Sequence, residues 1–110
     1  MMAAIEAAKG IGRGIQSVTL FEQEPKLGRK LAVTGAGRCN LSNDGVQASA
    51  YHGPDIDWIG TLLERFAVDD LERVLYRLGI PIYKTDDGWY YPLSQSAASV
   101  VSILEERLVG

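Results

Sequence analysis

The sequence is poor in the residues that usually build thiol or metal chemistry. Its 110 residues include one cysteine, Cys39, and one histidine, His52. A single cysteine forms no internal disulfide, and without a Cys/His cluster we expect no metal site. Cys39 also lacks a resolving cysteine, so a packed loop cysteine is favoured over a redox residue. His52 lies in a Tyr-His-Gly-Pro turn and is expected to be a surface or structural residue.

An excess of basic charge and long apolar runs are also missing. The net charge is −3, and acidic and basic residues are interspersed. A nucleic-acid-binding protein would carry a basic face, so nucleic acid is not an expected partner. No apolar stretch approaches the ~20 residues that cross a bilayer, and the start does not resemble a signal peptide. The expectation is one small cytoplasmic domain without a membrane partner.

The first half of the chain predicts a helix, a glycine turn and a strand. Residues 2–9 are alanine-rich and favour a helix, although no capping residue precedes it. The glycines of Gly10–Gly14 follow this helix, so they end it; a dinucleotide-binding turn must instead follow a strand and open a helix. β-branched and aromatic residues predict a strand at Ser17–Phe21 and a second extended segment at Lys30–Thr34. Residues 35–54 have the composition of a loop.

The second half predicts two helices. Apolar residues at helical spacing between Trp58 and Phe66 mark the first. The second is expected to begin at a capping box with Asp69 as N-cap and Glu72 reaching back. Gly79 then follows the last apolar residue of the helix and is expected to end it.

A hairpin and a final helix are expected after Gly79. Asp86-Asp87-Gly88 lies between two β-rich runs, which predicts a tight hairpin turn. The aromatic residues Trp89–Tyr91 are expected to pack across this hairpin rather than to bind a ligand. Either Ser94 or Ser96 would cap a last helix from Ala97 to Leu108.

Glu22 is the first candidate for a binding role. In the dinucleotide-binding βαβ unit, an acidic residue at the end of the second strand binds a ribose, about 20 residues past the glycine turn. Residues 2–22 have the order of the back half of that unit, so the Gly-x-Gly-x-x-Gly turn is expected upstream of Met1. On spacing alone, a solvated glutamate at a strand end is the simpler interpretation.

A second candidate is the segment Gly28–Asn40, which contains the glycine-rich stretch Thr34–Asn40. Glycines on either side of a single alanine let the backbone approach a flat ring or a phosphate. Arg29, Lys30 and Arg38 add positive charge nearby, and Asn40 offers both a donor and an acceptor. A Gly-Ala-Gly sequence can also be just a turn.

Taken together, these segments closely resemble a family of bacterial flavoproteins. Glu22, Gly28–Leu31 and Thr34–Asn43 occur in the register of the YhiN-like or BaiN-like NAD(P)/FAD-dependent oxidoreductases, also named the aminoacetone oxidase family. The likeness continues to Asp87–Ser94 and covers nearly the whole chain. Members of the family are much longer than this chain and bind FAD on a Rossmann-like domain.

The resemblance implies an α/β fold class. Residues 1–50 would be a partial Rossmann-like FAD-binding segment. Residues 51–110 would be a helical and hairpin segment that begins an inserted α+β substrate-side region. The first strand of the Rossmann-like domain is not in the sequence, which would leave Ser17–Phe21 as an open sheet edge. Self-association through that edge is expected.

The resemblance also implies the cofactor site and the activity. Glu22 would bind the adenosine ribose, and the residues along the cofactor towards the flavin would be Arg29, Lys30, Thr34, Gly35, Gly37, Arg38 and Asn40. The implied function is a flavoprotein oxidoreductase that uses FAD, with NAD(P)H expected in the full-length protein, on an unidentified small molecule. No catalytic residue is assigned, and the isolated 110-residue piece is expected to be inactive. The alternative is a non-catalytic α/β remnant or partner-binding module of a truncated gene.

Overall fold

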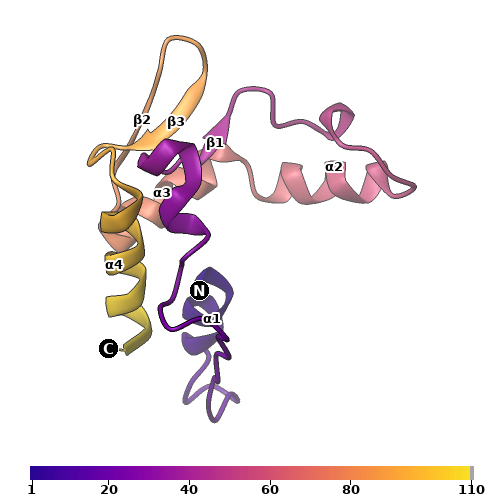
Figure 1. The fold of residues 1–110 in the computed structure, drawn as a ribbon. Coiled ribbons are helices and arrows are strands. Elements are labelled where there is room, and N and C mark those ends of the chain that lie inside the picture. The colour runs from indigo at the N-terminus through magenta and orange to yellow at the C-terminus, as the bar shows by residue number, and fades with distance from the viewer. Residues whose placement is uncertain (110) are drawn as a thin grey trace. The chain divides into compact units, whose positions relative to one another are not determined.

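The computed structural model describes residues 1–109, which form two compact units. The first unit contains Met1–Cys39 together with the residues from Ser96 onward, and the second contains Asn40–Gln95. Figure 1 shows the course of the chain through its helices and its small sheet. No helix in the described range is long and apolar enough to cross a membrane.

The first unit is built around the C-terminal helix. Helix α4 (Ala97–Val109) contacts both α1 (Met2–Ala8) and the 3-10 segment η1 (Leu31–Gly37). It buries four side chains at helical spacing, Ala97, Val100, Val101 and Leu104. These residues form one apolar stripe, which is the usual pattern of a helix with one face against a core. Ser96 caps α4, because its Oγ accepts a hydrogen bond from the Ser99 N–H at 3.2 Å.

Helix α1 and the glycine turn after it are confirmed, but the strand that was predicted next is wrong. Gly12 and Gly14 have φ of 80° and 108°, and Ile11 and Ile15 form an isolated bridge across the turn. Within the described residues, 16–23 form no strand and make no backbone–backbone hydrogen bond. A strand requires a neighbour for its N–H and C=O groups, and among residues 1–109 no strand pairs with this segment.

The second predicted extended segment, Lys30–Thr34, is also wrong. Its residues belong to the turn that leads into η1 and to η1 itself. Local hydrogen bonds close this turn: the Ala32 N–H donates to the Gly28 carbonyl at 2.9 Å, and the Thr34 hydroxyl donates to the Leu31 carbonyl at 2.7 Å. A side chain that donates a hydrogen bond to the backbone three residues earlier favours a turn over an extended strand, and these residues form a turn.

The second unit contains a three-stranded antiparallel sheet in the order β1-β3-β2. Its strands are β1 (Ser42–Asn43), β2 (Ile82–Lys84) and β3 (Trp89–Pro92). The β2–β3 hairpin is as predicted, with Tyr83 opposite Tyr91 and their ring centroids 6.2 Å apart. Tyr91 is buried, so the predicted cross-strand packing of the aromatic run is confirmed at this position.

Two helices precede this hairpin, as the apolar spacing predicted. Helix α2 (Ile56–Arg65) contacts the short 3-10 turn η2 (Ala48–Ala50), and α3 (Val68–Leu78) contacts β2. The predicted ending of α3 is confirmed, since Gly79 has φ of 92°.

The predicted beginning of α3 is wrong. The N-cap is Ala67, not Asp69, and the reciprocal carboxylate belongs to Asp70 rather than Glu72. The Asp70 carboxylate accepts a hydrogen bond from the Ala67 N–H at 2.9 Å. The helix therefore begins two residues earlier than the sequence indicated, because an aspartate at the third helical position can accept a hydrogen bond from the backbone N–H of a residue without a polar side chain.

Candidate cofactor-binding site

An open cavity of about 390 Å³ in the first unit brings together three of the predicted cofactor residues. Glu22, Arg29 and Lys30 line it with four further residues, Glu24, Gly28, Leu31 and Val33. The charged residues of this lining are two glutamates, one arginine and one lysine, so the cavity offers both anionic acceptors and cationic donors. Such a mixture suits a ligand that carries hydroxyl groups and phosphates.

The acidic side of this cavity is held by short local bonds. Oε1 of Glu22 accepts a hydrogen bond from the Glu24 N–H at 3.0 Å. Oε2 of Glu24 pairs with Nη1 of Arg29 at 2.6 Å, although 73% of the Arg29 side chain is exposed. An ion pair at this exposure contributes little to stability, so Arg29 can exchange Glu24 for another anion at small cost.

Gly28 lets the chain turn between the two glutamates and the two cations. Its φ is +68°, and a Cβ built on it would lie 2.9 Å from Cε of Met1 and 3.0 Å from Cγ1 of Val101. A side chain at this position would therefore push the cavity-lining loop away from α4. Glycine is required here by both the backbone angle and the space.

The rest of the predicted cofactor residues in the first unit lie in a loop that folds on itself. Gly35, Ala36 and Gly37 all have positive φ, of 56°, 54° and 84°. The Arg38 N–H donates to the Gly35 carbonyl at 3.1 Å and the Cys39 N–H to the Thr34 carbonyl at 3.0 Å. These residues do not line the Glu22 cavity.

Asn40 belongs to the second unit and has a structural part there. Its Nδ2 donates to the Ser42 carbonyl at 3.3 Å and to the Tyr90 carbonyl at 3.4 Å, which holds the start of β1 against β3. The predicted set is therefore divided: Glu22, Arg29 and Lys30 share a cavity, whereas Thr34, Gly35, Gly37, Arg38 and Asn40 lie elsewhere. Their roles toward a cofactor stay predictions.

Cys39 and His52 have the surroundings that the sequence favoured. Cys39 is fully buried, and burial raises the pKa of its thiol against a smaller opposing effect of a hydrogen bond with Thr34. A raised pKa keeps the thiol protonated and unreactive at neutral pH. His52 is exposed.

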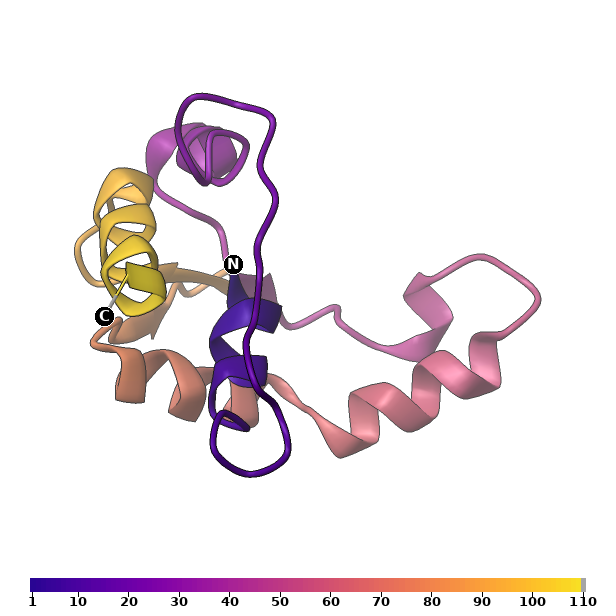
Figure 2. The same ribbon diagram turned by 90° about the horizontal axis from the view of Figure 1, so that it is seen from below.

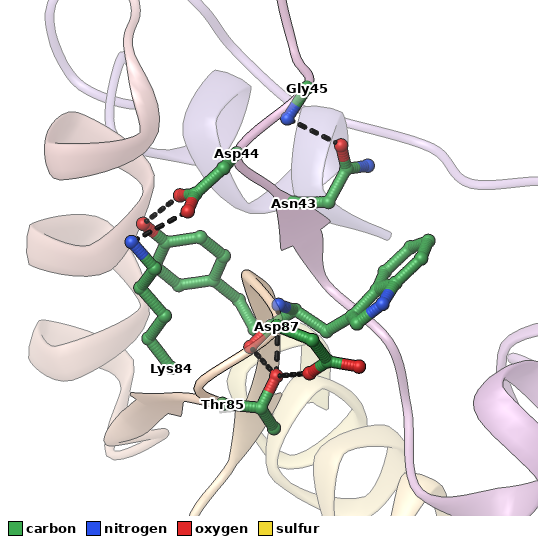
Figure 3. Close-up of polar contacts among 8 residues, drawn as sticks. Asn43, Asp44, Gly45, Lys84, Thr85 and Asp87 are labelled. Carbon is green, nitrogen blue, oxygen red and sulfur yellow. Dashed lines mark hydrogen bonds and ion pairs between the residues drawn. The ribbon is translucent and has the colours of Figure 1, made fainter.

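Sequence reasoning missed Glu24 in the cavity, included Gly28 in the candidate segment without naming it as a cofactor residue, and missed a polar cluster in the second unit. Glu24 could have been found as a second carboxylate two residues after Glu22. The cluster joins Asp44 to Lys84 and Tyr90, which are 40 and 46 residues away, so no local pattern reveals it. Figure 3 shows Asp44 and Lys84 pointing toward one another, beside the turn that carries Thr85 and Asp87.

The match to a protein family defines the class of protein, and the fold is consistent with it. The first unit has a glycine turn after its first helix and a mixed-charge cavity, and the second has helices and a small antiparallel sheet, so the chain is of the α/β class. The chain belongs to the family described as the HI0933-like protein Rossmann domain, whose match extends over residues 1–109. The family and the fold class predicted from the sequence are therefore confirmed.

Curated relatives of three bacteria are similar to the chain over most of its length. A 3-dehydro-bile acid delta(4,6)-reductase of Clostridium scindens is 38% identical over 108 residues, which are 98% of this chain and 26% of the relative. Two ribosomal RNA dihydrouridine synthases are similar as well. The synthase of Haemophilus influenzae is 27% identical over 84% of this chain and 23% of its own length. The synthase of Escherichia coli is 28% identical over 87% of this chain and 24% of its own length. The chain spans about a quarter of the length of these relatives.

Proposed function

We propose that the chain is the cofactor-binding part of a flavoprotein oxidoreductase that binds FAD. The observation that carries this proposal is the family match over residues 1–109, together with a relative at 38% identity that is named as a reductase. The cavity supports it, because Glu22 can accept hydrogen bonds from ribose hydroxyls and Arg29 and Lys30 can bind phosphate oxygens.

The names of the relatives indicate one reaction class. A delta(4,6)-reductase of a 3-dehydro-bile acid saturates double bonds conjugated to a ketone, and dihydrouridine is uridine whose ring double bond beside a carbonyl is saturated. We therefore propose that the full-length protein reduces a carbon–carbon double bond conjugated to a carbonyl. When bound, reduced FAD supplies the hydride for such a step, and NADH or NADPH is proposed to reduce the FAD.

We propose that the substrate is a small molecule and that the protein acts in the cytoplasm. The relative that is 38% identical acts on a bile acid by its name, and this chain has a net charge of −3. A ribosomal RNA substrate would require basic surface to neutralise phosphates, and this chain does not offer an excess of it.

Within this proposal, the residues of the cavity bind and orient. Glu22 would give up the Glu24 N–H to accept ribose hydroxyls, and Arg29 would exchange the Glu24 carboxylate for phosphate. Gly28 keeps the backbone close to α4 so that these side chains stay on one loop. Lys30 adds a second cation to the cavity lining.

The test uses the full-length polypeptide that the gene encodes around this chain. After reconstitution with FAD, we expect flavin absorbance that bleaches under anaerobic NADH or NADPH and returns when a conjugated steroid ketone is added. Return on addition of uridine-containing RNA but not of the ketone would make RNA the substrate instead. A full-length protein that holds no flavin would contradict the proposal and favour the alternative of a non-catalytic α/β module.

A further inference from the structure

A cavity of about 300 Å³ lies within the second unit. Its lining comes from β1 and the loop after it, from the junction of α2 and α3, and from β3. Pockets that bind small molecules have volumes of roughly 300–1,000 Å³. This cavity therefore suits a small ligand or one end of a larger one.

Contacts outside this cavity hold its walls together. The loop after β1 continues into η2, and η2 contacts α2. Figure 2 shows η2 beside α2, with the chain turning back between them. At its C-terminal end α2 reaches the cavity, where Leu63 and Phe66 line it. On the sheet side, the Asp44 N–H donates to the Gly88 carbonyl at 2.9 Å. The cavity is therefore part of the fold of this unit.

The lining combines apolar surface with polar groups and contains no lysine or arginine. Its large apolar side chains are those of Val46, Leu63, Phe66 and Val68. Phe66 is 50% exposed, so its ring is available to a ligand. A phosphate would find no basic side chain in this lining, whereas an apolar ring gains free energy by leaving water. The lining therefore favours an uncharged and largely apolar ligand.

The carboxylates of the lining do not require a cation from the ligand. Nζ of Lys84 lies 2.6 Å from Oδ2 of Asp44, and the Tyr90 hydroxyl donates to Oδ1 at 3.1 Å. Both oxygens of Asp44 thus have partners, and the Tyr90 hydroxyl is already used as a donor. Asp69 is exposed, so water and salt screen its charge.

Asn43 supplies the side-chain donor that such a ligand can use. Its Oδ1 accepts a hydrogen bond from the Gly45 N–H at 2.8 Å, which fixes the orientation of the amide. Figure 3 shows the amide oxygen toward Gly45 and the amide nitrogen turned away from it. Within residues 1–109, Nδ2 of Asn43 donates to no other group. An amide nitrogen held in this way can donate to a carbonyl oxygen.

We propose that this cavity binds the carbonyl end of an uncharged ketone conjugated to a ring double bond. The carbonyl oxygen accepts a hydrogen bond from Nδ2 of Asn43, and the ring packs against Leu63 and Phe66. The choice of a conjugated ketone rests on the proposed function. Uracil carries a similar carbonyl, but a nucleotide brings phosphates for which the lining has no basic partner.

Binding is measured on the 110-residue chain without flavin, so failure here is distinct from failure of the proposed flavoprotein function. The probe is testosterone, an uncharged ketone conjugated to a ring double bond. It should change the tryptophan fluorescence, because Trp89 lies opposite Asn43 in the β1–β3 pairing. No binding up to the solubility limit of the steroid would overturn the proposal. Uridine monophosphate that binds as tightly as testosterone would overturn it as well.

Asn43→Asp tests the donor, because it keeps an acceptor for the Gly45 N–H and removes the amide nitrogen. Testosterone binding should weaken about tenfold, since a hydrogen bond is lost and a carboxylate faces the carbonyl oxygen. Gln47→Glu is the matched control: it makes the same change at an exposed residue of the same loop that does not line the cavity. Equal effects of the two substitutions would refute the role of Asn43.

The absorbance of the probe reports on the hydrogen bond itself. A conjugated ketone absorbs at shorter wavelength when it leaves water for an apolar site, unless its carbonyl accepts a new hydrogen bond. Bound testosterone should therefore keep the wavelength that it has in water, and it should absorb at shorter wavelength when bound to the Asn43→Asp variant. A short-wavelength band with the original chain would show that Asn43 does not donate to the carbonyl.

A second pair of variants locates the ring of the ligand. Phe66→Ala should weaken testosterone binding about three- to tenfold, because part of the apolar surface that covers the ring is lost. Tyr76→Ala is the control: Tyr76 is an aromatic residue of α3 that is 71% exposed and does not line the cavity, so the affinity should not change. A loss with Tyr76→Ala and none with Phe66→Ala would place the steroid elsewhere on the chain and overturn the proposal.

Discussion

Nζ of Lys84 lies 2.6 Å from Oδ2 of Asp44, so an ion pair spans the central strand of the sheet. Lys84 ends β2 and Asp44 follows β1, and β3 runs between these two strands. The hydroxyl of Tyr90, on β3 itself, donates to Oδ1 of the same carboxylate at 3.1 Å. One carboxylate therefore connects all three strands, which share few backbone pairs.

The first prediction is a loss of stability in acid that depends on Asp44. Hydrogen bonding from Lys84, and to a smaller extent from Tyr90, lowers the pKa of Asp44. The pKa of Asp44 is therefore lower in the folded chain than in the unfolded chain. Because of this difference, the ionised carboxylate stabilises the fold above the unfolded pKa of about 3.9, and this stabilisation is lost as pH falls through the folded pKa. Asp44→Asn should therefore destabilise the chain at neutral pH and have progressively less effect below about pH 4.

Urea unfolding followed by tryptophan fluorescence measures this effect. Both tryptophans, Trp58 and Trp89, lie in the second unit and report on it. Asp86→Asn is the control, since Asp86 is an exposed carboxylate of the neighbouring turn. Equal effects of the two substitutions at every pH would show that the ion pair does not hold the sheet.

The second prediction concerns two glycines with opposite requirements. Gly79 has φ of 92° at the end of α3, whereas Gly60 lies inside α2, where an added Cβ would be 3.5 Å from Cβ of Ala48. Gly79→Ala should destabilise the second unit by about 1 kcal/mol, because it forces an L side chain into the left-handed region. Gly60→Ala should stabilise it by roughly 0.5–1 kcal/mol. The same fluorescence-detected unfolding gives both values, and a shared sign would contradict the geometry.

The third prediction is that Gly28→Ala disturbs the first unit. The new Cβ would meet Met1 and Val101 at 3.0 Å or less, and the positive φ adds strain. We expect a loss of about 1–3 kcal/mol, as for an added methyl group in a packed site. Faster hydrogen exchange in α4, with unchanged exchange in the β2–β3 hairpin, is the expected result. Unchanged exchange in α4 would show that the loop does not rest on that helix.

The fourth prediction concerns the reactivity of Cys39. Burial raises the pKa of this thiol, so the folded chain should react with iodoacetamide far more slowly than the same chain in urea. The chain has one cysteine, so the modified fraction measured by mass spectrometry refers to Cys39 alone. Rapid and complete modification of the folded chain would restore a redox role for this residue.

The fifth prediction tests Glu22 in the full-length protein. Glu22→Ala should weaken FAD binding by about 1–3 kcal/mol, the cost of leaving ribose hydroxyls without an acceptor. Glu22→Gln should cost less because it keeps an acceptor. Flavin fluorescence titration gives the affinities. If neither substitution changes them, Glu22 is a solvated surface residue and only its neighbours in the cavity remain candidates.

The isolated 110-residue chain provides a companion measurement for Glu22. We expect it not to retain stoichiometric FAD, because the cavity is open and the Glu22, Arg29 and Lys30 side chains around it belong to exposed residues. A preparation with about one flavin per chain would contradict this expectation and would mean that residues 1–110 hold the pyrophosphate without a glycine-rich turn between strand and helix.

Local patterns in the sequence determined most of the helices and the hairpin. The apolar spacing from Trp58 to Phe66 predicts α2, because residues three and four apart lie on the same face of a helix. The glycine after Leu78 predicts the end of α3, because helices commonly end at a residue in the left-handed conformation. Asp86-Asp87-Gly88 predicts the hairpin for the same reason, since its turn is closed within four residues. The grouping of Glu22 with Arg29 and Lys30 was suggested by the sequence and its family resemblance.

Only the tertiary structure decided the features that depend on distant partners. Ser17–Phe21 has the composition of a strand, yet strand formation needs a second row of donors and acceptors, which this unit does not provide. Likewise, the spacing of Gly35, Gly37 and Asn40 could not show that the two glycines close a loop whereas Asn40 bonds to the sheet. The hydrogen bond of Asn40 depends on Tyr90, which is fifty residues further along the chain. Hydrogen bonds and ion pairs between residues so far apart in sequence, such as the Asp44–Lys84 pair, are determined by tertiary packing. They produce no periodic pattern in the sequence.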